Sequence, residues 1–266
     1  MFQEKSVVLR NEKLGDAYYK IALSCHTGYA DAQPGQFVTL RFGDRIAPLL
    51  RRPFSIHRLI TAESGQVIGI EVLYKVVGTC TKTLSAYQKG DMTDVLGPLG
   101  NSFSIPDKIR RVFIVGGGIG IAPMVFLISE MRKKGLDLSE SAAFIGGRSA
   151  QDILCRKDFS DAGMPVFLTT DDGSEGKKGF VTEPLETAIR KNQPDMIYAC
   201  GPHPMLCAVA RMAEAYHAPC RISVETVMAC GMGACLGCAV ESRKNPNKYL
   251  HVCIDGPVFD TSVLKI

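Results

Sequence analysis

The segment RVFIVGGGIGIAP, residues 111–123, decides the fold class of this chain. It is an apolar run that ends in glycines and continues into a helical pattern, with Pro123 placed to suit a first helical turn. It differs from the G-x-G-x-x-G fingerprint of dinucleotide sites, because from Gly118 it runs G-x-G-x-x-P. Gly117, Gly118 and Gly120 would leave room for a pyrophosphate at the start of the helix. The alternative is ordinary turn chemistry without a ligand.

The same sequence pattern continues from residue 101 to residue 220. Short apolar runs alternate with helical patterns, which is typical of βαβ units and of a parallel sheet covered on both faces. The expected strands are 111–115, 142–145, 165–169 and 196–200, and the expected helices are 122–134, 150–159, 183–191 and 205–215. Cys200, Gly201 and Pro202 end one strand and precede a helix. Because the carboxyl ends of such strands share one crevice, these residues and the glycine loop together favour a nucleotide-binding domain.

Residues 1–100 show a different pattern, with short β-rich runs between turn signals and no long helical pattern. The expected strands are 7–10, 18–23, 36–42, 54–60, 67–77 and 91–96, with one helical turn at 81–87. The pattern predicts a small six-stranded antiparallel barrel.

Four of the ten cysteines gather in the last fifth of the chain. Cys230, Cys235, Cys238 and Cys253 have the spacing C-x4-C-x2-C-x14-C. The first three match the loop of a plant-type [2Fe–2S] cluster, whose fourth ligand is distant. A zinc ribbon uses facing C-x2-4-C knuckles, and Cys253 has no nearby cysteine with which to form a second one. We expect a cluster, with a zinc ribbon or a reduced loop without metal as alternatives. The expected domains are 1–100, 101–220 and 221–266.

A cluster accepts one electron at a time and a hydride carries two, so a flavin would have to stand between a cluster and a nicotinamide. Arg52-Pro53-Phe54-Ser55 is one possible flavin site. Pro53 holds Arg52 extended, and a guanidinium matches two phosphate oxygens at once. The alternative is an edge strand with a surface arginine. A second possible phosphate cradle, or an ordinary strand-to-helix turn, is the run GTCT at 78–81.

The composition limits the remaining classes. The chain has 266 residues, of which 46% are hydrophobic and 22% charged, as in ordinary globular proteins. The net charge is +4, and no run of five or six like charges indicates nucleic acid. No apolar stretch approaches the ~20 residues that span a bilayer. The first residues lack the apolar core of a signal peptide, so we expect a cytoplasmic protein in which cysteines serve metal or redox chemistry.

The motifs RPFS (52–55), GTCT (78–81), GGGIGIAP (116–123) and CGP (200–202), in this order, resemble the ferredoxin-reductase superfamily. Within it, MACGMGACLGC (228–238) and CIDGPVF (253–259) resemble the electron transfer subunits of type B dihydroorotate dehydrogenase. The resemblance covers essentially the whole chain, and the cysteine motif is its most specific part.

The resemblance implies an FAD-binding barrel, an NAD-binding α/β domain and a C-terminal [2Fe–2S] module. It implies a partner, an FMN-containing catalytic subunit that oxidises dihydroorotate in pyrimidine (UMP) synthesis, in a heterotetramer with two copies of each chain. Electrons would pass from FMN through the cluster and FAD to NAD⁺.

The same resemblance assigns residues to these groups. The residues that would contact FAD or its diphosphate are Arg52, Pro53, Phe54, Ser55, Leu73, Tyr74, Lys75, Gly78, Cys80 and Thr81, with Leu73 to Lys75 using their backbone. Ser55 is assigned to the flavin N5. The four cysteines of the late cluster would ligate iron. Many relatives have Gly-Thr where Cys80-Thr81 stands, so Cys80 is expected to lie near or crowd the flavin.

Some points stay open. Arg148 favours a 2′-phosphate and thus NADP, whereas the resemblance favours NAD(H). Glu225 precedes the cysteine loop and is expected to be a solvated or strand-capping carboxylate, with the flavin ring as its alternative neighbour. A related NADPH–ferredoxin oxidoreductase or sulfide dehydrogenase subunit is the second enzyme hypothesis. A nucleotide-binding regulatory protein with structural zinc is the hypothesis of another class.

Overall fold

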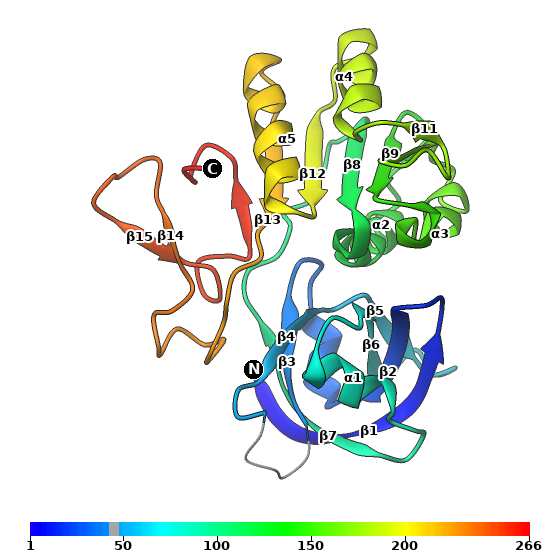
Figure 1. The fold of residues 1–266 in the computed structure, drawn as a ribbon, viewed down its shortest axis with the longest axis vertical. Coiled ribbons are helices and arrows are strands. Elements are labelled where there is room, and N and C mark those ends of the chain that lie inside the picture. Colours follow the sequence, from blue (N-terminus) through cyan, green and yellow to red (C-terminus); the bar gives the residue numbers. More distant parts are fainter. Residues whose placement is uncertain (43–47) are drawn as a thin grey trace.

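A computed structural model of the chain describes residues 1–42 and 48–266. Figure 1 shows a barrel below, an α/β layer above it and a C-terminal segment alongside both. In the described residues, seven antiparallel strands form the barrel sheet in the order β4-β3-β7-β1-β2-β6-β5. The strands are β1 (Phe2–Lys13), β2 (Tyr18–Ser24), β3 (Phe37–Arg41), β4 (Arg52–Ser55), β5 (Arg58–Thr61), β6 (Val67–Lys75) and β7 (Met92–Leu99), with short helices η1 (Thr27–Asp31) and α1 (Thr79–Ser85).

The barrel fold is as expected, but the strand expected at 54–60 is two strands. The chain breaks between β4 and β5, and these strands lie at opposite edges of the sheet. The backbone N–H of Ile56 donates to Gln36 on one edge, and that of His57 donates to Glu71 on the other. The segment therefore changes partners within two residues and joins the two edges, which explains seven strands where six were predicted.

The second sheet has the order β11-β10-β9-β8-β12-β13-β16 among the described residues. Its strands are β8 (Val112–Gly117), β9 (Ala142–Gly147), β10 (Val166–Thr170), β11 (Lys177–Lys178), β12 (Met196–Cys200), β13 (Cys220–Ser223) and β16 (Val258–Asp260). The strands are parallel except for β16, which pairs antiparallel with β13. From β8 the chain adds β9 and β10 on one side of that strand and then β12 on its other side. The strand order therefore reverses at β8, beside the glycine loop.

Helices cover both faces of this sheet. They are η2 (Gly118–Ile121), α2 (Ala122–Lys133), η3 (Ala150–Asp152), α3 (Arg156–Ser160), α4 (Thr182–Lys191) and α5 (His203–Ala215). One buried cluster joins α2 and α3 to one face, and another joins α4 and α5 to the other. The single helix expected at 150–159 is wrong, because η3 and α3 are separated by residues 153–155, where Cys155 has a φ of 58°.

The C-terminal segment is built onto the second sheet. That sheet continues past residue 220 through β13 and β16, strands that the periodicity of the sequence did not reveal. Between them lie the cysteine loop and a two-stranded hairpin of β14 (Ala239–Glu241) and β15 (Tyr249–His251). The loop and hairpin thus leave the sheet at residue 223 and return to it at residue 258.

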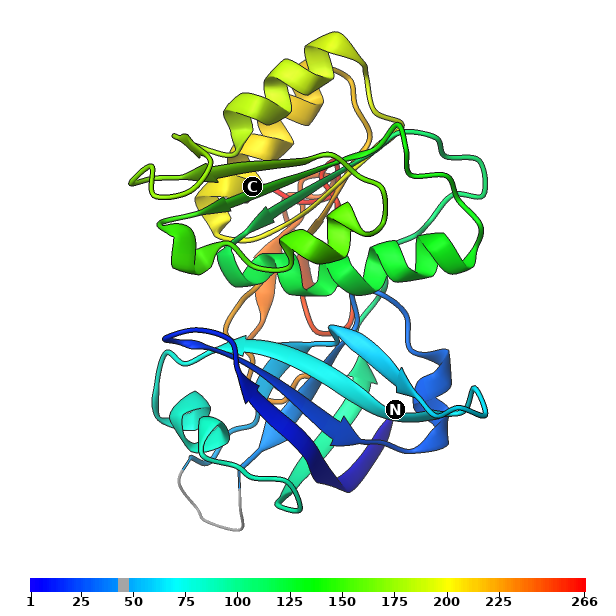
Figure 2. The ribbon, with the colours of Figure 1, turned by 90° about the vertical axis from the view of Figure 1, so that its right-hand side faces the viewer.

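Helix α2 joins the two larger parts. Figure 2 shows it on the side of the second sheet that faces the barrel. Its residues Leu127 and Ile128 pack in the core of the second sheet, whereas Phe126 is 1% exposed and packs in the barrel core. The helix that follows the glycine loop is therefore fixed to the barrel by apolar contact.

Candidate functional site

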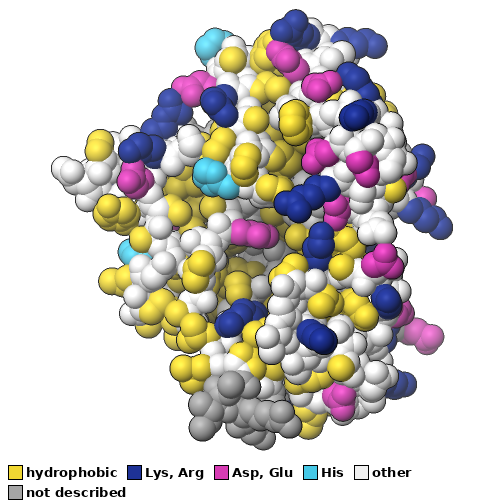
Figure 3. Space-filling view, viewed as in Figure 1, with side chains coloured by type: hydrophobic (Ala, Val, Ile, Leu, Met, Phe, Trp, Pro, Cys, Tyr) yellow, Lys and Arg dark blue, Asp and Glu magenta, His cyan; other side chains and the backbone are white. Residues whose placement is uncertain are grey.

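A cavity of about 800 Å³ lies between the barrel and the α/β part. Figure 3 shows the corresponding hollow in the middle of the face that it draws. All ten residues assigned to the flavin border the cavity: Arg52, Pro53, Phe54, Ser55, Leu73, Tyr74, Lys75, Gly78, Cys80 and Thr81. The cavity is large enough for a cofactor of drug size or more. The barrel segments 52–55, 73–75 and 78–81 therefore meet at the wall of this cavity.

Arg52 is the cation at this cavity that has no carboxylate partner in the part of the chain that the structure describes. Its Nη1 donates to the carbonyl oxygens of Leu50 and Arg51, at 2.9 Å and 3.2 Å. The neighbouring Arg51 is instead paired with Asp94. The Arg52 guanidinium therefore keeps donors for an anionic ligand, which fits the predicted contact with a diphosphate.

The run 78–81 starts helix α1 at the cavity wall. The Thr81 hydroxyl accepts from the N–H groups of Val77 and Gly78, at 2.9 Å and 3.2 Å, and so caps the helix. A Cβ added to Gly78 would meet nothing within 4 Å. The backbone of Gly78 is extended, with φ of −169°, so the fold itself does not require glycine there. The open space beside Gly78 fits the close approach of a phosphate.

Two of the residues that border the cavity have side chains packed in the barrel core. Tyr74 and Cys80 are buried in the barrel core, where the ring of Tyr74 packs against Phe54 at 6.1 Å between centroids. Tyr74 and Cys80 thus belong both to the barrel core and to the cavity wall. The predicted backbone contact of Tyr74 with the flavin and the predicted proximity of Cys80 to it stay predictions.

Lys75 makes a contact between the two parts of the molecule. Its Nζ lies 2.9 Å from Oδ1 of Asp152, a residue of η3, and 4.9 Å from the centre of the Tyr18 ring. The Tyr18 hydroxyl donates to the same carboxylate oxygen. Asp152 Oδ2 accepts from the backbone N–H of Arg148, at 3.1 Å. A barrel strand and the loop after β9 are thereby tied to one carboxylate.

The glycine loop and the CGP motif meet at the carboxyl edge of the second sheet. Gly116 pairs with Cys200 in the parallel ladder. A Cβ on Gly120 would lie 2.5 Å from the Cys200 carbonyl oxygen, and one on Gly117 would lie 2.7 Å from Cδ of Pro202. These glycines are therefore required by the close packing of the two motifs.

Of the six residues assigned to the nucleotide, Gly120 borders the cavity. The described lining of the cavity does not include the other five, which are Gly117, Gly118, Cys200, Gly201 and Pro202. Cys200 is 2% exposed, and burial raises the pKa of its thiol. The glycine loop thus reaches the cavity at Gly120, and the CGP motif packs against that loop.

Several residues of the cavity wall were not predicted from the sequence. Ser223, Thr226 and Met228 follow β13, and Pro257 precedes β16. Recognising strand β13 in the sequence would have predicted them. The carboxyl ends of the strands next to the point where the strand order reverses face the same crevice. Glu225 also borders the cavity, and its side chain is solvent-exposed, as expected. The protein around it partly desolvates its carboxyl and raises its pKa.

The cysteine loop presents backbone donors to sulfur. Cys230 Sγ accepts from the N–H groups of Met232 and Cys235, at 3.4 Å and 3.3 Å, and Cys253 Sγ accepts from Gly233, at 3.1 Å. Gly233 has φ of 83°, a conformation that glycine adopts without strain. Such N–H···S contacts stabilise thiolates and tune clusters.

The four thiols lie as two pairs. Cys238 and Cys253 are both 2% exposed, with their sulfurs 3.3 Å apart, and Cys230 and Cys235 form the outer pair. Within the residues described, no three His, Cys, Asp or Glu side chains are grouped as ligands of a single metal ion. Four thiols are nevertheless the number and kind of donor that a [2Fe–2S] cluster uses, so the donor set fits the predicted group.

The two pairs differ in acidity. Burial raises the pKa of the Cys230 thiol, but the N–H groups of Met232 and Cys235 outweigh it and lower that pKa to about 6. For Cys253, burial and the hydrogen bond from Cys238 raise the pKa to about 12. The outer pair therefore supplies the thiolate that forms first at neutral pH.

Comparison with known proteins agrees with this arrangement. Residues 225–265 match the family model described as the iron-sulfur cluster binding domain of dihydroorotate dehydrogenase B, and residues 114–211 match that of an oxidoreductase NAD-binding domain. The dihydroorotate dehydrogenase B (NAD(+)) electron transfer subunit of Desulforamulus reducens is 38% identical over 229 residues, which are 86% of this chain and 85% of that one. The subunit from Geobacillus sp. is 36% identical over 97% of each chain.

The chain belongs to the dihydroorotate dehydrogenase B electron transfer subunit family. Membership confirms the predicted oxidoreductase class and the predicted cofactors FAD, [2Fe–2S] and NAD(H). It also implies a catalytic partner subunit, because family members are named as one subunit of an enzyme.

Solved structures confirm the fold. The structure of NADH-dependent reduced ferredoxin-NADP oxidoreductase has a TM-score of 0.83 at 27% identity and covers 97% of this chain and 89% of that one. A ferredoxin NADP⁺ reductase from Neisseria gonorrhoeae shares the fold at 16% identity, with a TM-score of 0.64 over 80% of this chain and 91% of that one. In the described ranges, no helix is long and apolar enough to cross a membrane.

Proposed function

We propose that this chain carries electrons from an FMN-containing dihydroorotate dehydrogenase subunit to NAD⁺, through a [2Fe–2S] cluster and FAD, in pyrimidine synthesis. The family assignment supports the overall reaction. Under this proposal the ten barrel residues at the cavity bind FAD, the glycine loop and the CGP motif bind NAD(H), and the four late cysteines bind the cluster.

The observation that carries the proposal is the shared wall of the cavity and the cysteine loop. Met228 borders the cavity, and Cys230 is two residues further along the chain. Phe37 also borders the cavity, and its ring lies 3.8 Å from where a Cβ on Gly231 would stand. One layer of side chains thus separates the flavin space from the cysteine loop, which suits one-electron transfer between them.

When bound, the flavin supplies the change from one-electron to two-electron chemistry. The residues of the chain then have positioning roles. Arg52 donates to the diphosphate, Thr81 keeps the first turn of α1 in place, and Ser55 presents its hydroxyl from the end of β4 to the ring. Because hydride transfer needs no general acid or base from the protein, alignment of the two rings is the main task.

The partner would dock over the outer pair of thiols. Cys235 is exposed, and the side chains of Val227, Met232, Leu236 and Ile254 around the loop are between 44% and 84% exposed. Apolar side chains gathered at one surface mark an interaction site. We propose that the FMN-containing subunit covers them, in a heterotetramer of two copies of each chain.

Spectroscopy and reconstitution test the proposal. Anaerobically purified chain is expected to contain two irons, two sulfides and one FAD, and to reduce NAD⁺ with dihydroorotate only after the FMN subunit is added. Zinc without flavin would instead support a structural ribbon. Reduction of ferredoxin by NADPH, without response to dihydroorotate, would support the second enzyme hypothesis. Comparing NADH with NADPH in the same assay tests the proposed preference for NAD(H) over the NADP that Arg148 favours.

A further inference from the structure

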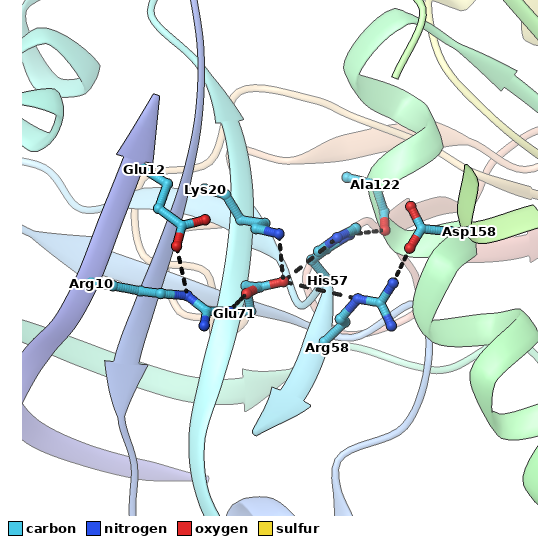
Figure 4. A network of polar contacts seen from close by, with 8 residues as sticks. All are labelled: Arg10, Glu12, Lys20, His57, Arg58, Glu71, Ala122 and Asp158. Carbon is cyan, nitrogen blue, oxygen red and sulfur yellow. Dashed lines mark hydrogen bonds and ion pairs between the residues drawn. The ribbon is translucent and has the colours of Figure 1, made fainter. Parts of the chain in front are cut away.

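His57 links the flavin motif to the helix that follows the glycine loop. It lies two residues after Ser55 and is 2% exposed. Its backbone N–H is bonded to β6, and its Nδ1 lies 2.8 Å from the carbonyl oxygen of Ala122, the first residue of α2. Figure 4 shows the ring reaching from the barrel to α2. This is a buried polar contact between the two parts of the molecule.

The partners of the ring determine its proton arrangement. A carbonyl oxygen only accepts, so Nδ1 must carry the proton that it donates to Ala122. On the other side, Nε2 lies 3.8 Å from Oε1 of Glu71, too far for a hydrogen bond. Burial lowers the pKa of His57, which favours the neutral ring with the Nδ1 proton.

Glu71 keeps the ring in place from behind. It is a 2% exposed carboxylate, and its Oε2 accepts from Arg10. Its Oε1 lies 3.7 Å from Lys20 Nζ and 3.9 Å from Arg58 Nε, and it has no hydrogen-bond partner in the residues that the structure covers. The surrounding cations hold the Glu71 carboxylate on the Nε2 side of the ring, and Ala122 is the partner within hydrogen-bond distance of the ring.

The carbonyl of Ala122, which accepts the hydrogen bond from His57, belongs to a residue of the cavity wall. Ala122 and Pro123 border the cavity and directly follow the glycine loop. One turn further along α2, Phe126 is buried in the barrel core. The first turn of α2 is buried by apolar packing, with Met124 and Val125 in the core of the second sheet. That core belongs to the α/β part, so the hydrogen bond from His57 adds a polar tie from the barrel at the end of α2 nearest the flavin space.

We propose that His57 is a positioning residue that sets the distance between the nucleotide loop and the flavin-binding strand. The proposal rests on the proposed function, in which FAD and nicotinamide meet in this cavity. Loss of the bond would leave FAD bound but would let the loop move relative to the ring. A misplacement of about 1 Å can slow a reaction about 100-fold.

Three variants of the full FAD-loaded chain test this role. His57→Asn places an amide donor near the position of Nδ1, toward Ala122. His57→Gln places the same amide near the position of Nε2, toward Glu71, and His57→Leu removes the donor. Asp158→Asn is the matched control, since it weakens the half-exposed ion pair with Arg58 across the same interface. The two amide variants have the same chemistry and differ only in where the donor lies.

The readouts are FAD content, the rate of flavin reduction by saturating NADH, and hydrogen exchange of residues 116–126. We expect all variants to retain FAD. His57→Gln and His57→Leu should lower the reduction rate about tenfold to 100-fold and raise exchange in that segment, whereas His57→Asn and Asp158→Asn should stay within about threefold of the parent chain.

Two results would overturn the role of His57. One is a parental reduction rate and parental exchange in His57→Gln. The other is an equal loss in the Asn and Gln variants, which would show that any change at this buried position acts through the fold. A parent chain whose FAD is not reduced by NADH at all would refute the proposed function instead, so the two failures are distinguishable.

Discussion

Two pairs of thiols of unlike acidity and exposure form the cysteine site. Cys235 is the exposed member, whereas Cys238 and Cys253 are enclosed between the loop and the hairpin. The sequence spacing singled out all four residues as candidate ligands. It did not predict which of them face solvent, because that depends on how the loop packs against residues almost 200 positions away, such as Thr39 beside Gly231.

Replacing Cys235 separates the two halves of the electron path. Cys235→Ser should abolish dihydroorotate-dependent reduction of NAD⁺ with the catalytic partner, while oxidation of NADH by a two-electron dye stays near the parental rate. The reason is that Cys235 lies outside the cavity wall, whereas the residues assigned to FAD are in the barrel. Both activities are measured beside Cys207→Ser, a control on α5 outside the motif. Equal loss of both activities in Cys235→Ser would contradict this division.

Gly78 allows a test of the flavin space that leaves the fold unchanged. Gly78→Ala should keep the melting temperature of the apoprotein, because the backbone is extended and the added Cβ meets no atom. It should weaken FAD binding about tenfold or more, because the methyl would occupy room needed by the phosphates. Gly15→Ala, also without a neighbour within 4 Å, is the control. FAD affinity is measured by quenching of flavin fluorescence, and unchanged affinity in Gly78→Ala would argue against a phosphate there.

At the scale of elements, most strands and helices follow from apolar periodicity, and the exceptions have local causes. The run 54–60 is uniformly β-rich, so its sequence contains no sign that Ile56 and His57 bond to opposite edges of the sheet. In the expected helix at 150–159, Cys155 adopts a left-handed backbone conformation that periodicity does not encode. Strand β13 (residues 220–223) lies across the domain boundary expected at residue 220, and no strand was expected there.

Helix α2 contributes side chains to the core of the second sheet and to the barrel core. Substitutions in it should therefore differ in their effect on FAD binding. Phe126→Ala and Leu127→Ala each remove a fully buried side chain and should each cost about 2–5 kcal/mol in the free energy of unfolding. Only Phe126 packs in the barrel core, so only its loss should weaken FAD binding beyond the effect on stability. Urea unfolding and FAD titration of both variants measure this. Equal FAD affinities would show that the barrel core does not depend on α2.

At the scale of the whole molecule, polar contacts hold the α/β part on the barrel. Asp152 binds Tyr18 and Lys75 across the interface, and Arg58 binds Asp158. Burial raises the pKa of Asp152, but the hydroxyl of Tyr18 and the ammonium of Lys75 outweigh it and hold that pKa below its usual range. The carboxylate is therefore charged through the neutral range. Sequence reasoning placed Lys75 at the flavin and missed this contact, since the sequence does not reveal how two domains face each other.

The depressed pKa gives the contact a defined dependence on pH. Its contribution to stability is present above the usual Asp pKa and is lost as pH falls through the lower folded value. Asp152→Asn should therefore lower the free energy of unfolding by about 1.5–3 kcal/mol at pH 7, with a difference that shrinks toward pH 3. Urea titrations of both proteins between pH 3 and pH 7 measure it. A difference that is constant over this range would exclude an ionic contribution from Asp152.

The way the cysteine loop is supported has a consequence for biosynthesis. Gly231, between its first two cysteines, lies against Thr39 of the barrel, and its fourth cysteine shortly precedes β16, which pairs with β13. A cluster that uses all four thiols must therefore be loaded after segments about 200 positions apart in the chain have docked. A maturation factor that delivers the inorganic centre would encounter a barrel and a sheet that are already folded.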